Sequence, residues 1–162
     1  MITAAHCKNP RIRELVLGDH DLSKDPDCEF SACLKAQRFK ILPSDFIVHE
    51  QYELSKVRTE GHDIALIRLP RLAETYQENV DQLVIPICLG WHRVQIPSNH
   101  AVVAGWGRTS NDFSDRGDLA ESGAFSNVLQ KVEVNLLTDS ECLQNFKNLN
   151  TQRQMCAGGE GG

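Results

Sequence analysis

The sequence predicts an all-β fold, and three observations support this. Short apolar runs recur along the whole chain, separated by polar stretches rich in Gly, Pro, Asp and Ser. Only one segment, residues 138–146, has a convincing helix start. The six cysteines lack the paired spacing of a zinc site and indicate disulfides, hence an oxidising compartment. Many short strands with turn signals between them are typical of a barrel or a sandwich.

In the first half of the chain, four apolar runs have the character of strands: residues 16–17, 39–42, 46–49 and 64–69. The last run is almost continuously apolar and stops at Pro70, as expected of a buried strand. The turn-rich acidic loop Asp19–Glu29 follows the first run.

The second half continues this pattern. Residues 84–89 are apolar, but Pro86 has no amide donor and therefore favours an edge strand or a connector. Residues 101–104 are a strand candidate that leads into a glycine turn at Gly105–Gly107. The stretch 108–127, rich in Ser, Asp, Gly and Asn, is expected to be an exposed loop.

One more strand and the helix close the chain. Apolar side chains alternate with polar ones, as in a half-buried strand, at Val132, Val134 and Leu136. Thr138 and Glu141 then have the spacing of a capping box, in which each side chain accepts a hydrogen bond from the other residue's amide. A short helix near 139–146 is therefore predicted.

Composition narrows the possible functions. The formal net charge is −5 and no cluster of Lys and Arg stands out, so nucleic acid is not an expected partner. No apolar stretch is long enough to span a bilayer, so no membrane association is expected either. The first residues do not read as a secretory signal, although the cysteine content favours secretion.

Four phrases resemble the motifs of the chymotrypsin/trypsin family of serine proteases, in that family's order: Ile2–Cys7, Gly61–Leu69, Val103–Gly107 and Met155–Gly159. Together they extend over nearly the whole chain, which makes the resemblance specific. It implies a chymotrypsin-like double six-stranded β-barrel that is incomplete in both barrels. Residues 1–95 would be the remainder of the first barrel with the connector, and residues 96–162 the first part of the second.

Within this family, the loop after Leu17 is most similar to that of the arthropod clip-domain serine proteases. Its phrases Gly18–Asp21 and Asp25–Cys28, with Cys33 five residues later, resemble a cysteine-closed loop in those proteins. The loop also resembles the calcium loop of trypsin, in which Asp19 would be a hard oxygen ligand. The alternative is a solvated acidic turn. No cofactor is expected to be required beyond this structural calcium.

The resemblance makes His6 the general base and Asp63 the residue that orients it. A serine hydroxyl becomes a good nucleophile only when a nearby base takes its proton, and histidine suits that task near neutral pH. A buried carboxylate on the other ring nitrogen fixes the tautomer and stabilises the imidazolium. Fifty-seven positions separate the two residues, so only folding can bring them together.

The residues also have simpler interpretations. His6 could be an ordinary histidine at a helix start, and Asp63 an exposed residue that ends a turn. The other histidines are expected to be structural or at the surface: His20, His49, His62, His92 and His100. His62 adjoins Asp63, but neighbouring residues of a strand point to opposite faces.

The family's cysteine pairing implies two disulfides, Cys142–Cys156 and Cys28–Cys33. In the family, Cys7 pairs with a cysteine upstream of the histidine motif, and Cys88 of clip-domain proteases usually tethers a regulatory segment. Neither partner is in this sequence, so both thiols are expected to be unpaired.

The resemblance further implies that the family's N-terminal strand pair is missing. So are the nucleophilic serine, the oxyanion hole, the specificity pocket and the final helix, which would follow Gly162. No serine of the chain lies in a Gly-Asp-Ser-Gly phrase, so none is a candidate nucleophile. We therefore expect the 162-residue chain alone to be inactive and to fold poorly.

Three functions remain open. The chain could be an incomplete copy of an active, secreted cascade endopeptidase that cleaves proteins after Arg or Lys, a preference implied only by the resemblance. It could belong to a non-catalytic protease homologue that acts as a binding cofactor in a cascade. It could also be a short interaction protein. The retained His6 and Asp63 favour the first.

Overall fold

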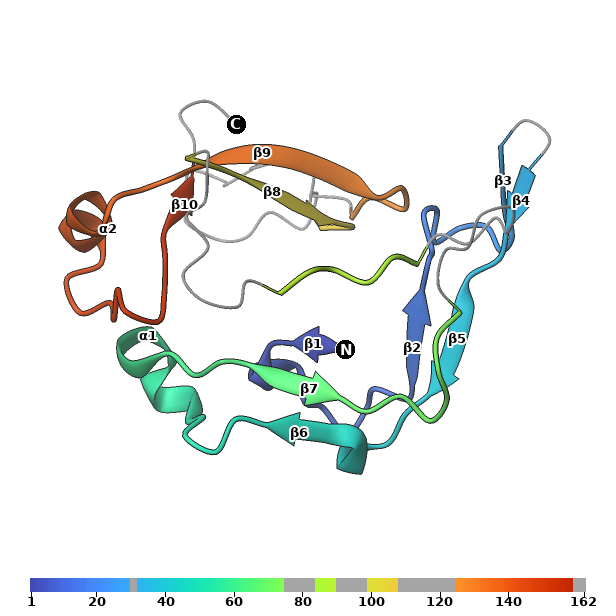
Figure 1. Cartoon of the computed structure of the whole chain (residues 1–162), viewed down its shortest axis with the longest axis horizontal. Helices are drawn as coiled ribbons and strands as arrows, with labels where there is room; N and C mark the ends of the chain where they lie inside the picture. Colours follow the sequence, from blue (N-terminus) through green and yellow to red (C-terminus); the bar gives the residue numbers. More distant parts are fainter. Residues whose placement is uncertain (30–31, 75–83, 90–98, 108–124, 159–162) are drawn as a thin grey trace, which may run out of the picture.

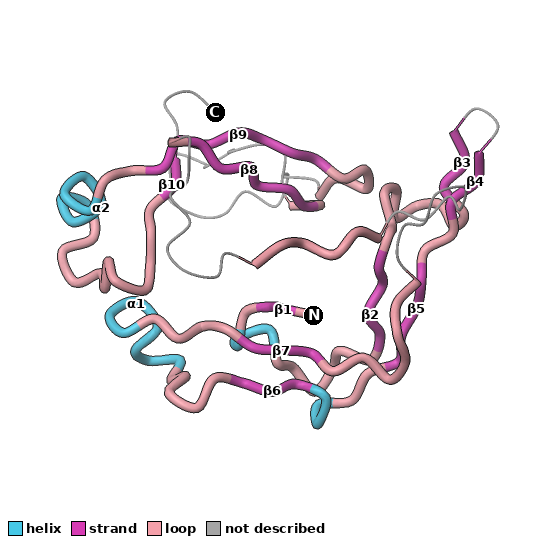
Figure 2. Tube along the Cα trace, viewed as in Figure 1, coloured by secondary structure: helices cyan, strands magenta, loops and turns pink. Residues whose placement is uncertain are grey.

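The computed structural model describes residues 1–29, 32–74, 84–89, 99–107 and 125–158. Short strands predominate, as expected (Figures 1 and 2). They form open sheets with the strand orders β1-β7-β6, β10-β9-β8, β2-β5 and β3-β4, and no closed barrel is found within the described ranges. No helix in these ranges has the length and apolar character that a bilayer crossing requires.

The described residues of the first half, up to residue 89, form seven strands: β1 (Ile2–Thr3), β2 (Glu14–Leu17), β3 (Asp27–Glu29), β4 (Ala32–Leu34), β5 (Gln37–Lys40), β6 (Phe46–Val48) and β7 (Ala65–Ile67). Three 3-10 turns and one α-helix connect them: η1 (Ala5–Cys7), η2 (Pro43–Asp45), η3 (Leu54–Lys56) and α1 (Val57–Glu60). The second half holds β8 (His100–Gly105), β9 (Gln130–Leu136), α2 (Asp139–Asn145) and β10 (Ala157–Gly158).

The core lies in the first half, between the β6–β7 pair and the β2–β5 pair. Phe39, Ile41, Phe46 and Ile67 form its buried centre, and partly buried side chains such as Leu15 pack against it. In β5, buried residues alternate with exposed ones, as expected of a strand with one solvent-exposed face. This single cluster holds β5, β6 and β7 together, and β7 leads directly from Asp63.

The prediction of a buried strand over 64–69 was wrong in two respects. The hydrogen-bonded strand is only Ala65–Ile67, and its side chains alternate between buried and exposed. Leu66 is exposed because it lies on the outer face, opposite Ile2 of β1 and Ile47 of β6. An antiparallel sheet needs to cover only one face, so an apolar run does not guarantee burial on both.

The second sheet also departs from the prediction. The expected strand exists as β9, and Val134 and Leu136 are half-buried. Val132, however, is 56% exposed, and Val102 and Val103 of the neighbouring strand β8 are 62% and 54% exposed. Apart from Cys142, the described residues that are buried and apolar all belong to the first half, so nothing among them covers this part of the sheet.

Other predictions agree with the structure. Residues 84–89 form no strand, in line with the argument from Pro86. Helix α2 ends at the predicted place and has the predicted capping box: the Glu141 amide donates to Thr138 Oγ1 over 3.3 Å, and the Thr138 amide donates to Glu141 Oε2 over 2.8 Å. Residues 108–124 of the expected loop, and His92, lie outside the described residues.

The two halves are joined at two places. Near β2 and β3, the amides of Leu22 and Leu129 bond across the halves, and Trp106 Nε1 donates to the His20 carbonyl over 3.1 Å. At the other end, Gln154 Nε2 donates to the Val57 carbonyl of α1 over 3.0 Å. Figure 1 shows β1, β6 and β7 below β8, β9 and β10, β3 and β4 at the height of β9, and α1 and α2 at the same end of the molecule.

Candidate active site

His6 and Asp63, which lie far apart in the sequence, meet at the start of β7. His6 Nδ1 lies 2.6 Å from Asp63 Oδ2, and the His6 amide donates to Asp63 Oδ1 over 2.9 Å. Both carboxylate oxygens of Asp63 therefore contact the same residue, His6. Because a carboxylate only accepts, Nδ1 carries the proton in this bond when the imidazole is neutral.

Local structure explains how the two residues reach one another. His6 lies in the 3-10 turn η1, which follows directly on β1, and the neighbouring Ala5 is buried. β1 pairs with β7, with Thr3 opposite Ala65. Asp63 lies two positions before that pair, so the pairing brings the end of β1 beside the start of β7.

The pair is unequally exposed. The side chain of His6 is 56% exposed and that of Asp63 only 21%. Burial alone would raise the pKa of Asp63, but hydrogen bonds from the His6 ring, the His6 amide and the Ala5 amide, together with the charge of His6, hold the pKa below its ordinary value. Asp63 is therefore ionised at neutral pH.

This arrangement leaves His6 Nε2 available. Within the described residues, the only hydrogen bond of the ring is the one from Nδ1, and no serine hydroxyl contacts it. A neutral ring that donates from Nδ1 keeps its lone pair on Nε2. The pair can thus take a proton at Nε2 while Asp63 stabilises the resulting imidazolium.

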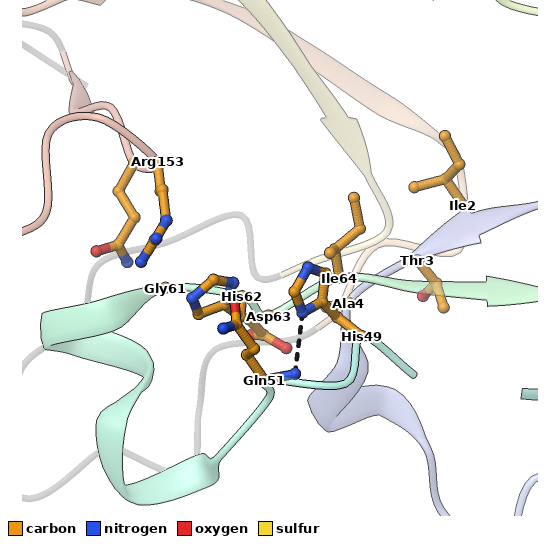
Figure 3. A pocket seen from close by; sticks show the side chains of 11 residues that line it. Ile2, Thr3, Ala4, His49, Gln51, Gly61, His62, Asp63, Ile64 and Arg153 are labelled. Carbon is orange, nitrogen blue, oxygen red and sulfur yellow. Dashed lines mark hydrogen bonds between the residues drawn. The ribbon is translucent and has the colours of Figure 1, made fainter. Parts of the chain in front are cut away.

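A pocket of about 820 Å³ lies beside the pair. Asp63 lines it, together with Ile2–Ala4, Gly61–Ile64 and Arg153–Gln154 (Figure 3). His49 and Gln51 complete the wall, and the Gln51 amide donates to His49 Nδ1 over 3.1 Å. The pocket thus combines the carboxylate of Asp63 with two imidazoles and a guanidinium.

No motif in the sequence places His49 and His62 in this pocket. The argument that His62 and Asp63 are neighbours in a strand was wrong, because β7 begins only at Ala65. His62 instead has φ 65°, a left-handed conformation, and follows Gly61 at φ 76°. Gly61, which directly precedes His62 and Asp63 in the sequence, was the available signal of an irregular backbone at this place.

The disulfides of the structure are the pairs that the resemblance implies. Cys28 bonds to Cys33 across β3 and β4, where the two residues are direct partners in register. Cys142 of α2 bonds to Cys156, which directly precedes β10. Cys7 and Cys88 are free thiols in the structure, the first partly buried and the second exposed.

The loop from Asp19 offers few ligands for calcium. Asp27 accepts from the amides of His20 and Asp21, and Asp21 is itself bonded to Ser23 and paired with Lys24 at 2.8 Å. Within the described part of this loop, only Asp19 Oδ1 is a buried side-chain oxygen without a hydrogen-bond partner. No three His, Cys, Asp or Glu side chains come together as metal ligands in these ranges. Calcium takes six to eight oxygens, so the described residues do not by themselves fit the ion.

Electrostatics set Asp19 apart from its neighbours. Burial raises its pKa, and the nearby carboxylate of Asp27 raises it further, against a smaller effect of Arg38. By contrast, the hydrogen bonds of Asp21 with Lys24 and Ser23 lower its pKa to about 2. The surroundings of Asp19 therefore disfavour its ionised form, whereas those of Asp21 favour it.

Comparisons with known proteins agree with the motifs. The sequence model of the family described as Trypsin matches residues 1–162. Phenoloxidase-activating factor 1 of Holotrichia diomphalia is 29% identical over 99% of this chain and 43% of its own length. Melanization protease 1 of Drosophila melanogaster is 32% identical over 98% of this chain and 40% of its own length. The chain thus spans less than half the length of these curated relatives.

A solved structure gives the same picture in three dimensions. The crystal structure of the Drosophila Grass clip serine protease of the Toll pathway is similar with a TM-score of 0.73 and 28% sequence identity. The similar region covers 99% of this chain and 43% of that chain.

Proposed function

The chain belongs to the trypsin family, whose chymotrypsin-like fold it shares, and on this premise we propose that it supplies the base of a serine endopeptidase. His6 is the general base and Asp63 orients it. The observation that carries the proposal is the double contact of Asp63, at 2.6 Å to His6 Nδ1 and 2.9 Å to the His6 amide.

The proposed reaction is acyl transfer to a serine that this sequence does not contain. His6 Nε2 takes the proton of the serine hydroxyl as its oxygen attacks the scissile carbonyl carbon. The same proton then passes from Nε2 to the nitrogen of the leaving amine. Water repeats both steps on the acyl-enzyme and releases the acid product. Throughout, Asp63 keeps the proton of Nδ1 in place and stabilises the imidazolium.

The wider setting is part of the proposal. We place the protein outside the cell, because its cysteine content and its two disulfides suit an oxidising compartment. The names of the relatives, a phenoloxidase-activating factor and a melanization protease, support a role in a protease cascade with protein substrates. Preference for Arg or Lys before the scissile bond rests on the resemblance to clip-domain proteases.

The direct test is covalent labelling with a fluorophosphonate probe. The protein extended by the sequence that follows Gly162 in its transcript should react, and His6→Ala should abolish the reaction. Asp63→Asn should lower kcat by about 10⁴-fold, the magnitude known for serine-protease triads themselves. The 162 residues alone should not be labelled, since none of their serines is a candidate nucleophile. Full activity of the His6→Ala protein would refute the proposal.

A second candidate is a non-catalytic homologue that acts as a binding cofactor. The contacts between His6 and Asp63 are compatible with it as well, because this pair does not include the nucleophile. The codons after Gly162 separate the two functions, since serine in the position of the nucleophile supports the endopeptidase and glycine supports the homologue.

A further inference from the structure

Two consecutive residues of the second half, Arg153 and Gln154, bind the helix that precedes Asp63. Gln154 Nε2 donates to the Val57 carbonyl over 3.0 Å, and Arg153 Nη1 donates to the Glu60 carbonyl over 3.3 Å. Val57 and Glu60 are the first and the last residue of α1. We call Arg153 and Gln154 the clamp, because they hold this short helix at both of its ends.

The clamp also packs over the turn that leads from α1 to Asp63. Gly61 directly follows the helix and is buried. A Cβ placed on Gly61 would lie 3.5 Å from Arg153 Cβ and 3.5 Å from Gln154 Cγ. Figure 3 shows the side chain of Arg153 beside Gly61 and His62. The hydrogen bonds and the packing of the clamp therefore act on one continuous stretch of backbone.

This stretch of backbone has a conformation that its own residues do not fix. Gly61 has φ 76° and His62 φ 65°, so two successive residues lie in the left-handed region. Glycine adopts either hand about equally, and a residue with a Cβ disfavours the left-handed one. The Ile64 amide then bonds to the His62 carbonyl and closes a γ-turn around Asp63. Such conformations persist where surrounding contacts hold them.

The polar group of Gln154 adds little to the stability of α1. Gln154 Oε1 is buried and has no hydrogen-bond partner among the described residues, which is destabilising. The Val57 carbonyl already accepts the Gly61 amide over 3.1 Å, so it would not be left unpaired without Gln154. For packing alone, an apolar side chain of the same length would serve as well. The directed bond of Gln154 therefore points to a role in orientation.

We propose that Arg153 and Gln154 are positioning residues for Asp63. By fixing the end of α1 and the backbone of Gly61, they set the place from which the carboxylate reaches His6. The carboxylate has to meet two atoms of His6, at 2.6 and 2.9 Å, so a small displacement breaks at least one contact. The effect on catalysis rests on the proposed endopeptidase function, whereas the effect on the geometry of the pair does not.

The kinetic test is Gln154→Met in the extended protein. Methionine keeps a stem that packs over Gly61 and removes the amide. We expect kcat to fall about 10-fold with KM unchanged, because a misplacement of about 1 Å can cost about 10²-fold in rate. The denaturant midpoint should stay the same, since the lost bond is offset by the lost unpaired acceptor. The matched control is Gln152→Met, an exposed residue of the same turn that does not line the pocket beside Asp63.

Arg153 gives a second, independent pair of variants. Arg153→Met removes the donor to the Glu60 carbonyl and should lower kcat several-fold. Arg153→Lys keeps a cation that can donate to this carbonyl and should restore most of the loss. Unchanged kcat in both methionine variants of the clamp, or an equal fall in Gln152→Met, would overturn the proposal. A higher KM with unchanged kcat in Gln154→Met would also overturn it, because it would indicate a substrate contact instead.

The proton between His6 Nδ1 and Asp63 Oδ2 provides a readout that needs no catalysis. In so short a bond, 2.6 Å, its NMR resonance lies far downfield of ordinary amide protons. Asp63→Asn should abolish this resonance, Gln154→Met should broaden or weaken it, and Gln152→Met should leave it unchanged. The resonance is measured in the same extended proteins as the kinetics.

The two readouts separate this proposal from the proposed function. Loss of the resonance in Gln154→Met, in a protein that cleaves no substrate even when unmutated, would support the clamp and reject the endopeptidase. A full resonance and full kcat in Gln154→Met, beside an active unmutated protein, would reject the clamp and leave the endopeptidase intact.

Discussion

The imidazole of His62 stacks on the imidazole of His49, with the ring centroids 4.6 Å apart and the planes inclined by 29°. His49 is also bonded to the residue on the other side of Asp63, because its amide donates to the Ile64 carbonyl over 3.1 Å. In a further hydrogen bond, the Ile64 amide donates to the His62 carbonyl over 2.8 Å. The backbone on both sides of the candidate orienting carboxylate is thus held by one histidine.

The first prediction concerns His62. His62→Asn removes the stacked ring but keeps a residue that tolerates the left-handed φ of 65°. We expect a loss of a few-fold in kcat of the extended protein, because Asp63 is held less firmly, with little change in KM. His62→Ala should also lower the free energy of unfolding by about 1 kcal/mol, since alanine is less tolerant of this conformation.

The matched control is Gln51→Ala, which alters a lining side chain of the same pocket but leaves both rings in place. A kcat for His62→Asn that equals that of the control would contradict the role given to the stack.

The second prediction concerns pH. Burial lowers the pKa of His62, and the charges of Arg153 and His49 lower it further, against an opposite effect of Glu60. Between this lowered value and about 6.5, the unfolded chain binds the proton more tightly. Stability is therefore complete above about pH 6.5 and falls as the pH drops through the window. Thermal unfolding between pH 5 and 8 measures this, and His62→Asn should flatten the curve.

The third prediction concerns Asp63. Its lowered pKa means that the folded state holds the proton less tightly than the unfolded state does. The stability that the ionised carboxylate contributes is present above about pH 4 and lost as the pH falls through the folded value. Asp63→Asn should therefore weaken the pH dependence of Tm between pH 5 and 3. An unchanged acid limb in this variant would refute the assignment.

The fourth prediction concerns the cap of α2. Thr138→Ala removes the acceptor for the Glu141 amide and should cost about 1 kcal/mol of unfolding free energy. Thr138→Ser keeps the hydroxyl and should retain most of the stability. Denaturant unfolding of both variants compares them directly, and equal losses would show that the methyl group rather than the cap matters.

The fifth prediction uses Asp19 to test for calcium. Its buried, unpaired oxygen and its raised pKa mean that the ionised carboxylate destabilises the loop in the absence of a cation. With EDTA, Asp19→Asn should therefore raise Tm. If the loop binds calcium, millimolar calcium should raise the Tm of the unmutated protein and reverse the sign of the Asp19→Asn effect. Identical Tm values of the unmutated protein with EDTA and with calcium would show that the loop does not bind calcium.

Elements with a local cause could be predicted from the sequence. The capping box of α2 is a four-residue pattern, and the structure has both of its bonds. The argument against a central strand at Pro86 is equally local. The meeting of His6 and Asp63 followed from the family resemblance, since nothing in the residues between them specifies that approach.

Features that depend on packing could not be predicted. The exposure of Val132 depends on what covers the sheet. An alternation of apolar and polar residues does not specify that cover. The stack of His49 on His62 depends on a left-handed backbone next to Gly61. The bond between Gln154 and α1 needs two segments to meet that lie 97 positions apart.

The contacts of α1 with the second half also affect folding kinetics. The bonds from Arg153 and Gln154 span 93 and 97 positions in the chain. Such distant contacts close large loops and form late, after the local core around Phe39. On synthesis from the N-terminus, α1 must therefore wait for almost the whole described chain before its partner exists. The junction beside Asp63 is therefore among the last parts of the described chain to close.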